Sequence, residues 1–405
     1  MPRAGQVKPP SDERLSDRVA IGLLTRVFPP AVVDAAVAAA ERAEVRNRLL
    51  PARLTVYYVL AMCLFSGQGY EEVMRLLTNG LEWLGRWRRP WSVPSTAAIA
   101  KARARLGPEP LRELFEAVVR PLAAETTQGS WYRGLRVVSM DGTTLDLADT
   151  AENEGRFGQP GSSRGEGRSA YPQVRLVGLG ECGTHAVFAA AMGPYTSAEK
   201  TLAGEVLAKL APGMVLLADC GFLGYELWQA AAATGAQLVW RASDTFSLPA
   251  LELLADGSYL SRLVPGKGTG PAKAGAGPLA VRVVEYVIDD GHAPQGERYR
   301  LVTTMADPDG APAAELAQLY SQRWELEVAL DELKAHQRAA AVVLRSRYPD
   351  GVEQEVWGFL LVHWAIRELA HTAALDAGAD QDRLSFTRAL RPVRRSVTDQ
   401  AAFSP

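Results

Sequence analysis

The chain has 405 residues, 47% of them hydrophobic and 22% charged, which is the composition of a folded globular protein and excludes global disorder. Its 44 basic and 46 acidic side chains leave a net charge of −2, so the overall balance does not indicate a nucleic-acid partner, and any such surface has to be local. The three cysteines, Cys63, Cys182 and Cys220, form no CxxC pair, which argues against a zinc knuckle and favours a reducing compartment such as the cytoplasm.

Two features argue against a membrane protein. Residues 1–15 lack the hydrophobic core of a signal peptide, and we expect them to form a disordered polar tail. The apolar runs "VYYVLAMCLF" and "WGFLLVHWAI" reach only about half of the roughly 20 residues that a membrane-spanning helix needs. We therefore expect buried helices in a cytoplasmic protein with no membrane partner.

Residues 16–125 have the pattern of an all-α domain, with apolar side chains three and four positions apart. Near the end of this region, Ser95 as the N-cap and Gly107 as the stop predict a short helix that carries Lys101 and Arg105 on one face. Clustered basic side chains on a rigid helix suit DNA phosphates, which makes this helix a candidate DNA-binding element. A solvated helix face explains the same pattern, and the sequence leaves both interpretations open.

Residues 130–243 change to an α/β pattern, in which three strands precede the first helix. The first strand, in "LRVVSMDGTTLDLAD", is expected to end in a turn at Asp141 and Gly142, and a later strand, in "VLLAD", ends at Asp219. Ligand sites in α/β sheets lie beyond the carboxyl ends of strands, so the two carboxylates converge if these strands are neighbours. The simpler interpretation is that Asp141 belongs only to a turn and that Asp219 only caps a helix.

The remaining regions differ in composition. Residues 244–305 combine glycine-rich stretches with strand-like segments and predict a β-rich insertion. Residues 306–345 return to a helical pattern, with one long helix over about residues 313–337. Residues 346–405 predict a helical C-terminal region that ends in a basic tail.

The long helix contains an unusual stripe of polar side chains within "YSQRWELEVALDELK", residues 320–334. At about 100° per residue, Tyr320, Arg323, Glu327 and Lys334 lie on one face beside an apolar face. Such a stripe suits the edge of a cleft, where a carboxylate binds a cation and basic groups contact phosphate.

A surface helix with salt-bridged charges is the alternative interpretation, and Glu325 and Glu332, which point away from the stripe, are expected to face solvent. The two aspartates upstream make that alternative weaker. Together, Asp141, Asp219 and Glu327 form a set of three carboxylates suited to one or two Mg²⁺ ions, because hard cations prefer such oxygens.

The spacing Tyr, two residues, Arg, three residues, Glu, six residues, Lys in this helix resembles the signature of the insertion-sequence-four family of bacterial DDE transposases. The segments "VVSMDGTTLDL" and "LLADCGFLGYELW" resemble the first and second aspartate blocks of that family, and the resemblance covers most of the chain. It implies an α/β fold with an RNase H-like catalytic domain that contains a β-rich insertion. An all-α N-terminal domain precedes this catalytic domain, and a helical C-terminal region follows it.

The same resemblance assigns roles to residues. It implies that the three carboxylates are the catalytic, metal-binding triad for Mg²⁺, with Mn²⁺ as an alternative and two ions per site. It also implies that Tyr320, Arg323 and Lys334 contact DNA. One departure concerns Cys220, because family members often carry arginine directly after the second aspartate, which puts a phosphate contact there in doubt.

A transposase of this kind cuts and joins the ends of an insertion element by metal-dependent phosphodiester hydrolysis and strand transfer. The expected partners are double-stranded DNA with terminal inverted repeats, target DNA, and a second copy of the chain in the DNA complex. The expected location is the bacterial cytoplasm, in association with the nucleoid. The alternative function is that of a catalytically inactive, transposase-derived DNA-binding regulator, and the presence of all three carboxylates favours the enzyme.

Overall fold

The structure is a computed structural model that describes residues 21–44, 49–78, 93–161, 171–265, 277–288, 297–338, 343–379 and 384–398. The tail predicted over residues 1–15 lies outside the described residues. No helix in the described ranges is long and apolar enough to cross a membrane.

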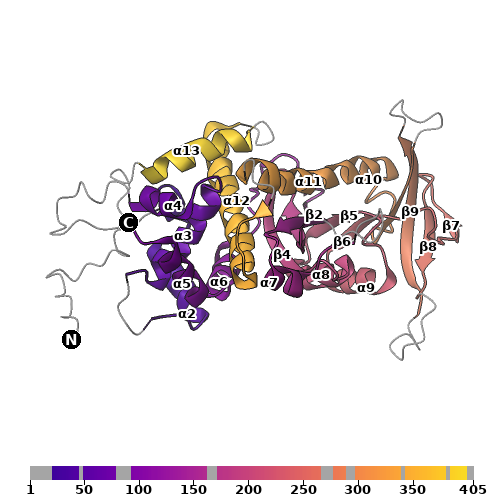
Figure 1. Cartoon of the computed structure of the whole chain (residues 1–405). Coiled ribbons are helices and arrows are strands. Elements are labelled where there is room, and N and C mark those ends of the chain that lie inside the picture. Colours follow the sequence, from indigo (N-terminus) through magenta and orange to yellow (C-terminus); the bar gives the residue numbers. More distant parts are fainter. Residues whose placement is uncertain are drawn as a thin grey trace, which may run out of the picture.

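A large mixed sheet runs through the molecule, with helices on both of its faces (Figure 1). The described residues contribute 11 strands to it, namely β1 (Trp131–Tyr132), β2 (Leu135–Leu147), β3 (Gln173–Glu181), β4 (Ala186–Pro194), β5 (Met214–Ala218), β6 (Gln237–Arg241), β7 (Glu252–Leu253), β8 (Tyr259–Leu263), β9 (Leu279–Ile288), β10 (Glu297–Thr303) and β11 (Val343–Leu344). Their order is β4-β3-β2-β5-β6-β10-β9-β8-β7, and both β1 and β11 pair with β2. The predicted mixed α/β class is confirmed.

Strand directions divide this sheet. Strand β3 is antiparallel to β2 and β4, whereas β5 is parallel to β2 and β6. Parallel neighbours require crossovers, and these contain α8 (Glu199–Val206) before β5 and α9 (Tyr225–Ala233) before β6. One expectation was wrong, because a short helix, α7 (Ala151–Phe157), lies between β2 and β3. It begins after Thr150, whose hydroxyl oxygen accepts a hydrogen bond from the Asn153 amide at 3.3 Å.

Successive side chains of β2 enter different layers. Val138 and Met140 belong to the apolar cluster beneath α8 and α9, whereas Val137 belongs to the cluster beneath α10 (Ala313–Tyr320). Helix α11 (Trp324–Asp331) packs against β2 and β3. This alternation is the period of two expected of a strand.

The region predicted as a β-rich insertion continues the same sheet. Strand β10 pairs with β6 in an antiparallel arrangement, and β9, β8 and β7 follow outward in that order (Figure 1). The strand-like segments therefore form strands, and these strands widen the central sheet. The boundaries of an insertion at residues 244 and 305 remain a prediction.

All the regular elements in the described part of the N-terminal region are helices. Its helices are α1 (Leu24–Val27), α2 (Pro30–Ala39), α3 (Ala52–Leu64), α4 (Tyr70–Thr78), α5 (Thr96–Leu106) and α6 (Glu109–Val118). Helix α5 begins and ends as predicted, because Ser95 Oγ accepts from the Ala98 amide at 3.3 Å and Gly107 adopts the left-handed φ of 71° that stops the helix.

The long helix predicted over residues 313–337 is present but not uniform. It consists of α10, a 3-10 turn at Ser321–Arg323, α11, and a π-helical turn at Glu332–Gln337 that we call η6. The C-terminal region contains the expected apolar helix, α12 (Pro349–Ala377), and a further helix, α13 (Phe386–Thr398).

Helix α12 joins the two parts of the molecule. It lies between the N-terminal helices and the sheet (Figure 1), and one continuous apolar cluster contains side chains of α3, α12, β3 and α11. Residues from the predicted all-α domain and from the sheet therefore share one core.

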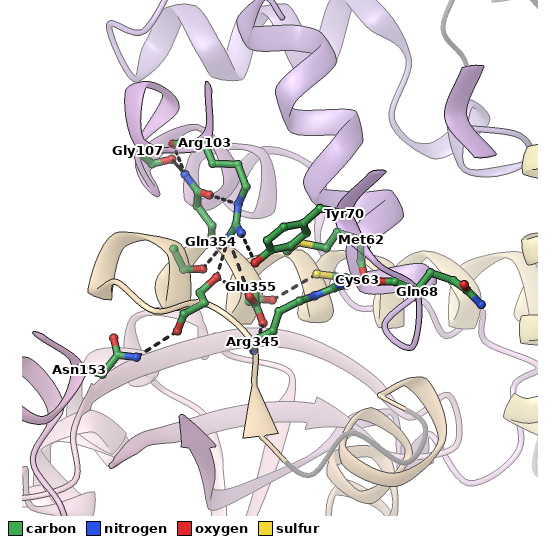
Figure 2. Close-up of polar contacts among 12 residues, drawn as sticks. Met62, Cys63, Gln68, Tyr70, Arg103, Gly107, Asn153, Arg345, Gln354 and Glu355 are labelled. Atoms are coloured by element: carbon green, nitrogen blue, oxygen red, sulfur yellow. Dashed lines mark hydrogen bonds and ion pairs between the residues drawn. The ribbon is translucent and has the colours of Figure 1, made fainter. Parts of the chain in front are cut away.

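A buried polar network fastens α5 to α12 (Figure 2). Arg103 Nε donates to Gln354 Oε1 at 3.0 Å, and Arg103 Nη2 donates to Ser346 Oγ at 2.8 Å and lies 3.9 Å from Glu355. Gln354 Nε2 donates in turn to the carbonyl oxygens of Arg103 and Gly107 at 2.7 and 2.8 Å, at the C-terminal end of α5. The network thus satisfies both a buried cation and the last carbonyls of a helix.

We predict that Arg103→Met lowers the free energy of unfolding by about 3 kcal/mol, because it removes a buried cation that lies 3.9 Å from the buried Glu355 carboxylate. Urea unfolding of the full chain at pH 7 measures this change. The control is Arg112→Met, which removes an exposed arginine from a nearby helix and is expected to change the free energy by less than about 0.5 kcal/mol. Equal effects of the two substitutions would contradict the prediction.

Candidate active site at the ends of β2 and β5

The two aspartates lie on neighbouring strands at the same level. Strands β2 and β5 are parallel, and their last register pair is Met140 with Ala218. Asp141 is the next residue of β2, and Asp219 is the residue directly after the end of β5. The condition set by the sequence, that the two strands be adjacent, is met.

The turn predicted at Asp141 and Gly142 is absent. Strand β2 continues to Leu147, with Asp141 opposite Gly178 and Gly142 opposite Val177 of β3. The Asp-Gly pair suggested a turn because it is common in turns, but the antiparallel partner β3 holds this stretch extended. Asp141 therefore lies within a strand, at the point where the neighbouring β5 ends.

Tyr320, at the end of α10, contacts the second aspartate. Its hydroxyl group donates to Asp219 Oδ1 and lies at the same 3.4 Å from the carbonyl oxygen of Ala218. The ring packs edge-on against Tyr299 with the ring centroids 6.3 Å apart, and 3% of the residue is exposed. Tyr320 thus links the signature helix to Asp219, and its burial leaves little surface for the predicted DNA contact.

Arg323 is also buried, with 7% of the residue exposed. Its guanidinium lies over the Trp324 ring at 4.5 Å from the centroid, and its Nε has no hydrogen-bond partner among the described residues. A buried arginine with an unsatisfied donor is able to accept an anionic ligand.

The surroundings of Asp141 raise its pKa above the ordinary value of an aspartate. Burial raises this pKa, the Gly142 amide and the Arg323 charge lower it, and the charges of Glu327 and Glu199 raise it, with a net shift upward. The charge of Glu327, which is half-buried on α11, thus acts on Asp141, and the shared site of the three carboxylates stays a prediction. Glu199, at the start of α8, is a neighbour that the sequence analysis missed.

The carboxylates of Asp141, Asp219 and Glu327 are the type of ligand that divalent cations such as Mg²⁺ prefer. They are hard oxygen donors, and a bound cation would offset the unfavourable effect of the Glu327 charge on the ionised form of Asp141. Among the described residues, no three histidine, cysteine, aspartate or glutamate side chains are gathered closely enough to hold a metal ion. Joint binding of one ion would require the side chains to move closer together.

Cys220 stands where the family often has a basic residue. It is half-buried, and its Sγ lies 3.6 Å from Asp219 Oδ2. Burial and the Asp219 charge raise the pKa of the thiol, so Cys220 stays neutral and supplies no cation for a phosphate.

The other predicted DNA contacts lie apart or are only partly free. Lys334 is half-buried in η6, and Lys101 is exposed on α5. Arg105 donates to Glu44 Oε1 at 3.0 Å and to the Leu50 carbonyl at 2.8 Å, so its guanidinium is already engaged within the N-terminal helices. Helix α5 lies on the other side of α12 from strands β2 and β5 (Figure 1), so the structure does not bring it to the ends of these strands.

Glu325 and Glu332 were expected to face solvent, and this prediction was wrong. Glu332 is buried, forms an ion pair with Arg367 of α12, and lies 3.2 Å from His363 Nε2. Glu325 is half-buried and accepts a hydrogen bond from the Gly183 amide in the turn between β3 and β4. The helix has protein on both sides, and the π-helical turn that begins at Glu332 shifts the spacing assumed for a regular α-helix.

Comparisons with known proteins agree with the resemblance seen in the sequence. The family described as "Transposase DDE domain" matches residues 132–365, and the family described as "Insertion element 4 transposase N-terminal" matches residues 18–116. The transposase InsG for insertion sequence element IS4 of Escherichia coli (strain K12) is 27% identical over 383 residues, which are 93% of this chain and 83% of that protein. The putative transposase InsZ of the same strain is 25% identical over 217 residues, which are 54% of this chain and 69% of that protein.

A solved structure of a transposase complex aligns with most of the chain. It is a cryo-EM structure of the piggyBac transposase synaptic complex with hairpin DNA, and the alignment covers 97% of this chain and 84% of that one. The TM-score of 0.47 and the identity of 12% are too low to establish a shared fold.

We predict that Glu332→Gln lowers the free energy of unfolding at pH 7 by about 3 kcal/mol, because it leaves Arg367 buried without a counter-charge. Asp331→Asn is the control, since Asp331 precedes Glu332 on the same helix but is exposed. Chemical unfolding of both variants measures the difference, and an effect of Glu332→Gln no larger than that of Asp331→Asn would contradict the prediction.

The same network predicts a pH dependence. Burial by itself would raise the pKa of Glu332, but hydrogen bonds from His185 and His363 and the charge of Arg367 outweigh it and hold this pKa well below 4.5. Burial lowers the pKa of His363 below 6.5. Each group therefore contributes stability that is fully present above its ordinary pKa and is lost as the pH falls toward its lower native pKa.

Unfolding free energies measured from pH 7 down to pH 4 should accordingly decrease. The part of the decrease that occurs below about pH 4.5 should be smaller in Glu332→Gln, which has no carboxyl group to protonate at that position.

Proposed function

Because the chain belongs to the insertion-sequence-four family of DDE transposases, we propose that Asp141, Asp219 and Glu327 are the carboxylates with which it cuts and joins DNA. The chain is a transposase, and the enzymes of this family generally use divalent metal ions. The observation that supports this triad best is the register of β2 and β5, which sets the two aspartates side by side at the end of β5. The effect of the Glu327 charge on the pKa of Asp141 supports Glu327 as the proposed third member.

The proposal includes an RNase H-like fold for the catalytic domain. Three antiparallel strands, β4-β3-β2, followed by the parallel strands β5 and β6 support this assignment. The proposed division of the chain is that of the sequence analysis, with helical regions before residue 125 and after residue 346. The regions on the two sides of these boundaries share one hydrophobic core, because a single apolar cluster contains side chains of the N-terminal helices, the sheet and α12.

The proposed cofactor is Mg²⁺, with Mn²⁺ as an alternative and two ions in the working site, held by the three carboxylates. When bound, these ions would activate the attacking water or DNA 3′-hydroxyl group and stabilise the leaving oxygen. The other residues of the site act on the carboxylates. Tyr320 donates a hydrogen bond to Asp219 and thereby orients it, and the buried Arg323 supplies positive charge beside Asp141.

The proposed partners are the terminal inverted repeats of an insertion element and a target DNA, bound by a homodimer at the nucleoid of a bacterial cell. Lys334 would contact a DNA phosphate as a point charge. Arg323 would donate a hydrogen bond from its Nε, which has no partner among the described residues, to a DNA phosphate that approaches it. The inactive regulator is not favoured by any feature of the site, because all three carboxylates are present.

We predict that Asp141→Asn, Asp219→Asn and Glu327→Gln each reduce DNA cleavage by on the order of a thousandfold, because each removes a charged oxygen ligand. The assay is Mg²⁺-dependent nicking of DNA that carries the element's terminal repeats. Asp331→Asn is the matched control, since it lies four residues from Glu327 and is exposed. Normal cleavage by Glu327→Gln would exclude the assigned third carboxylate.

Lys334→Ala tests the proposed phosphate contact separately. We expect weaker binding to DNA of any sequence, together with a reduction of about one in the slope of log K against log salt concentration. The same measurement on Lys101→Ala tests the candidate DNA-binding face of α5. An unchanged slope in either variant would show that the lysine concerned does not contact a phosphate.

A further inference from the structure

Strand β3 carries a glycine, Gly180, at a place where glycine is unfavourable. Gly180 is buried inside the sheet opposite Ser139 of β2, and glycine in a strand has no side chain to pack and loses more conformational freedom on folding than other residues. The register with β4 shifts between Leu179 and Gly180, but such a bulge requires glycine only where φ is left-handed, and Gly180 is not among the glycines with that φ. The explanation for this glycine therefore lies in the space around it.

A side chain of α11 fills that space. A Cβ atom placed on Gly180 would lie 2.6 Å from Leu326 Cδ1, 3.4 Å from its Cγ and 3.5 Å from its Cβ. Carbon atoms in contact are about 3.5 to 4.0 Å apart, so the shortest of these distances is a steric clash. Leu326 is 1% exposed and belongs to the same apolar cluster as Leu330 and Leu333, which limits its freedom to move aside. Helix α11 therefore rests on the bare backbone of β3 at Gly180.

The bare surface of β3 extends to the level of the first aspartate. Alternate residues of a strand share a face, so Gly178 lies on the same side of the sheet as Gly180. Gly178 pairs with Asp141 of β2, and Gly180 pairs with Ser139. Strand β3 thus presents no side chain to α11 at two successive positions, and the second of them adjoins Asp141.

Two polar contacts hold α11 and the turn before it at the end of the same strand. The Gly183 amide donates a hydrogen bond to the Glu325 carboxylate, and Cys182 Sγ donates to the Gln322 carbonyl oxygen at 3.5 Å. Gly183 and Cys182 follow Gly180 within three residues. These contacts fix the position of α11 along β3, whereas the contact of Leu326 with Gly180 sets the distance of the helix from the sheet.

We propose that Gly180 is a positioning residue for DNA cleavage, because the absence of a side chain there lets α11 approach the sheet closely enough for Glu327 to act together with Asp141 and Asp219. This inference rests on the proposed function. Glu327 directly follows Leu326, so a displacement of the helix at Leu326 also displaces Glu327. A misplacement of about 1 Å in a catalytic site is enough to lower the rate about a hundredfold.

The first experiment measures Mg²⁺-dependent cleavage of terminal-repeat DNA by the full chain carrying Gly180→Ala. At saturating DNA the rate should fall roughly 10- to 100-fold, because the added Cβ pushes α11 away from the sheet. The affinity for the DNA should stay the same, because residue 180 is buried beneath α11. Gly204→Ala is the control: it adds the same methyl group on α8, where nothing lies within 4 Å, and should cleave like the unsubstituted chain.

The second experiment asks whether a smaller side chain on α11 restores the rate. Leu326→Val removes a methylene group where Gly180→Ala adds a methyl group, so the double variant keeps the total volume of the contact. It should cleave about tenfold faster than Gly180→Ala alone, although Leu326→Val by itself brings no gain in rate. A double variant that cleaves no faster than Gly180→Ala would overturn the proposal.

Glu327→Gln separates the possible failures. If this variant does not cleave while Gly180→Ala cleaves like the unsubstituted chain, the proposed triad stands and the role of Gly180 is overturned. If Glu327→Gln cleaves normally, the proposed third carboxylate fails and the inference fails with it. Circular dichroism and urea unfolding give the folded fraction of each variant. A loss of rate in Gly180→Ala that a loss of folded chain explains in full would also overturn the proposal.

Discussion

The parallel pairing of β2 with β5 is the constraint on which the site depends. It sets Asp141 beside Asp219, and because parallel strands cannot be joined by a hairpin, it requires the crossover that contains α8. That helix begins with Glu199, directly over Gly142. Strand β5 ends one residue before the level of Asp141, so no described residue of β5 pairs with β2 at that position. A single register thus explains why residues from distant parts of the chain surround one aspartate.

Helix α12 supplies the second constraint, because it packs against the helix that carries Glu327 and against the N-terminal helices. Its polar contacts with these elements are buried. Arg367 donates a hydrogen bond to Glu332, and His363 Nε2 lies at hydrogen-bond distance from the same carboxylate. Gln354 accepts a hydrogen bond from Arg103, and Glu355 lies 3.9 Å from the Arg103 guanidinium (Figure 2). Buried charges are costly unless they are paired, so such contacts are satisfied in few arrangements of the helices. Through Glu332 they connect the helix that carries Glu327 to α12.

Sequence patterns predicted most of the elements but not all of their surroundings. The strand around Val138 and the capped helix after Ser95 follow from local preferences, which the structure confirms. The wrong predictions concern neighbours that are distant in sequence. The Asp-Gly pair was expected to turn because β3 was not visible as its partner. Glu332 was expected to be solvated because periodicity on one helix does not reveal a second helix packed across it.

The sequence by itself determined the chemistry available to this protein: two strand-borne aspartates, a helix with glutamate, arginine and lysine at fixed spacing, and a resemblance that the comparisons bear out. These are local properties, because side-chain type and spacing are written along the chain. Only the tertiary structure decided which groups meet. Strand register brings Asp141 to Asp219, the crossover brings Glu199 to Gly142, and packing against α12 buries Glu332. Contacts of this kind join residues tens or hundreds of positions apart, and no local pattern specifies them.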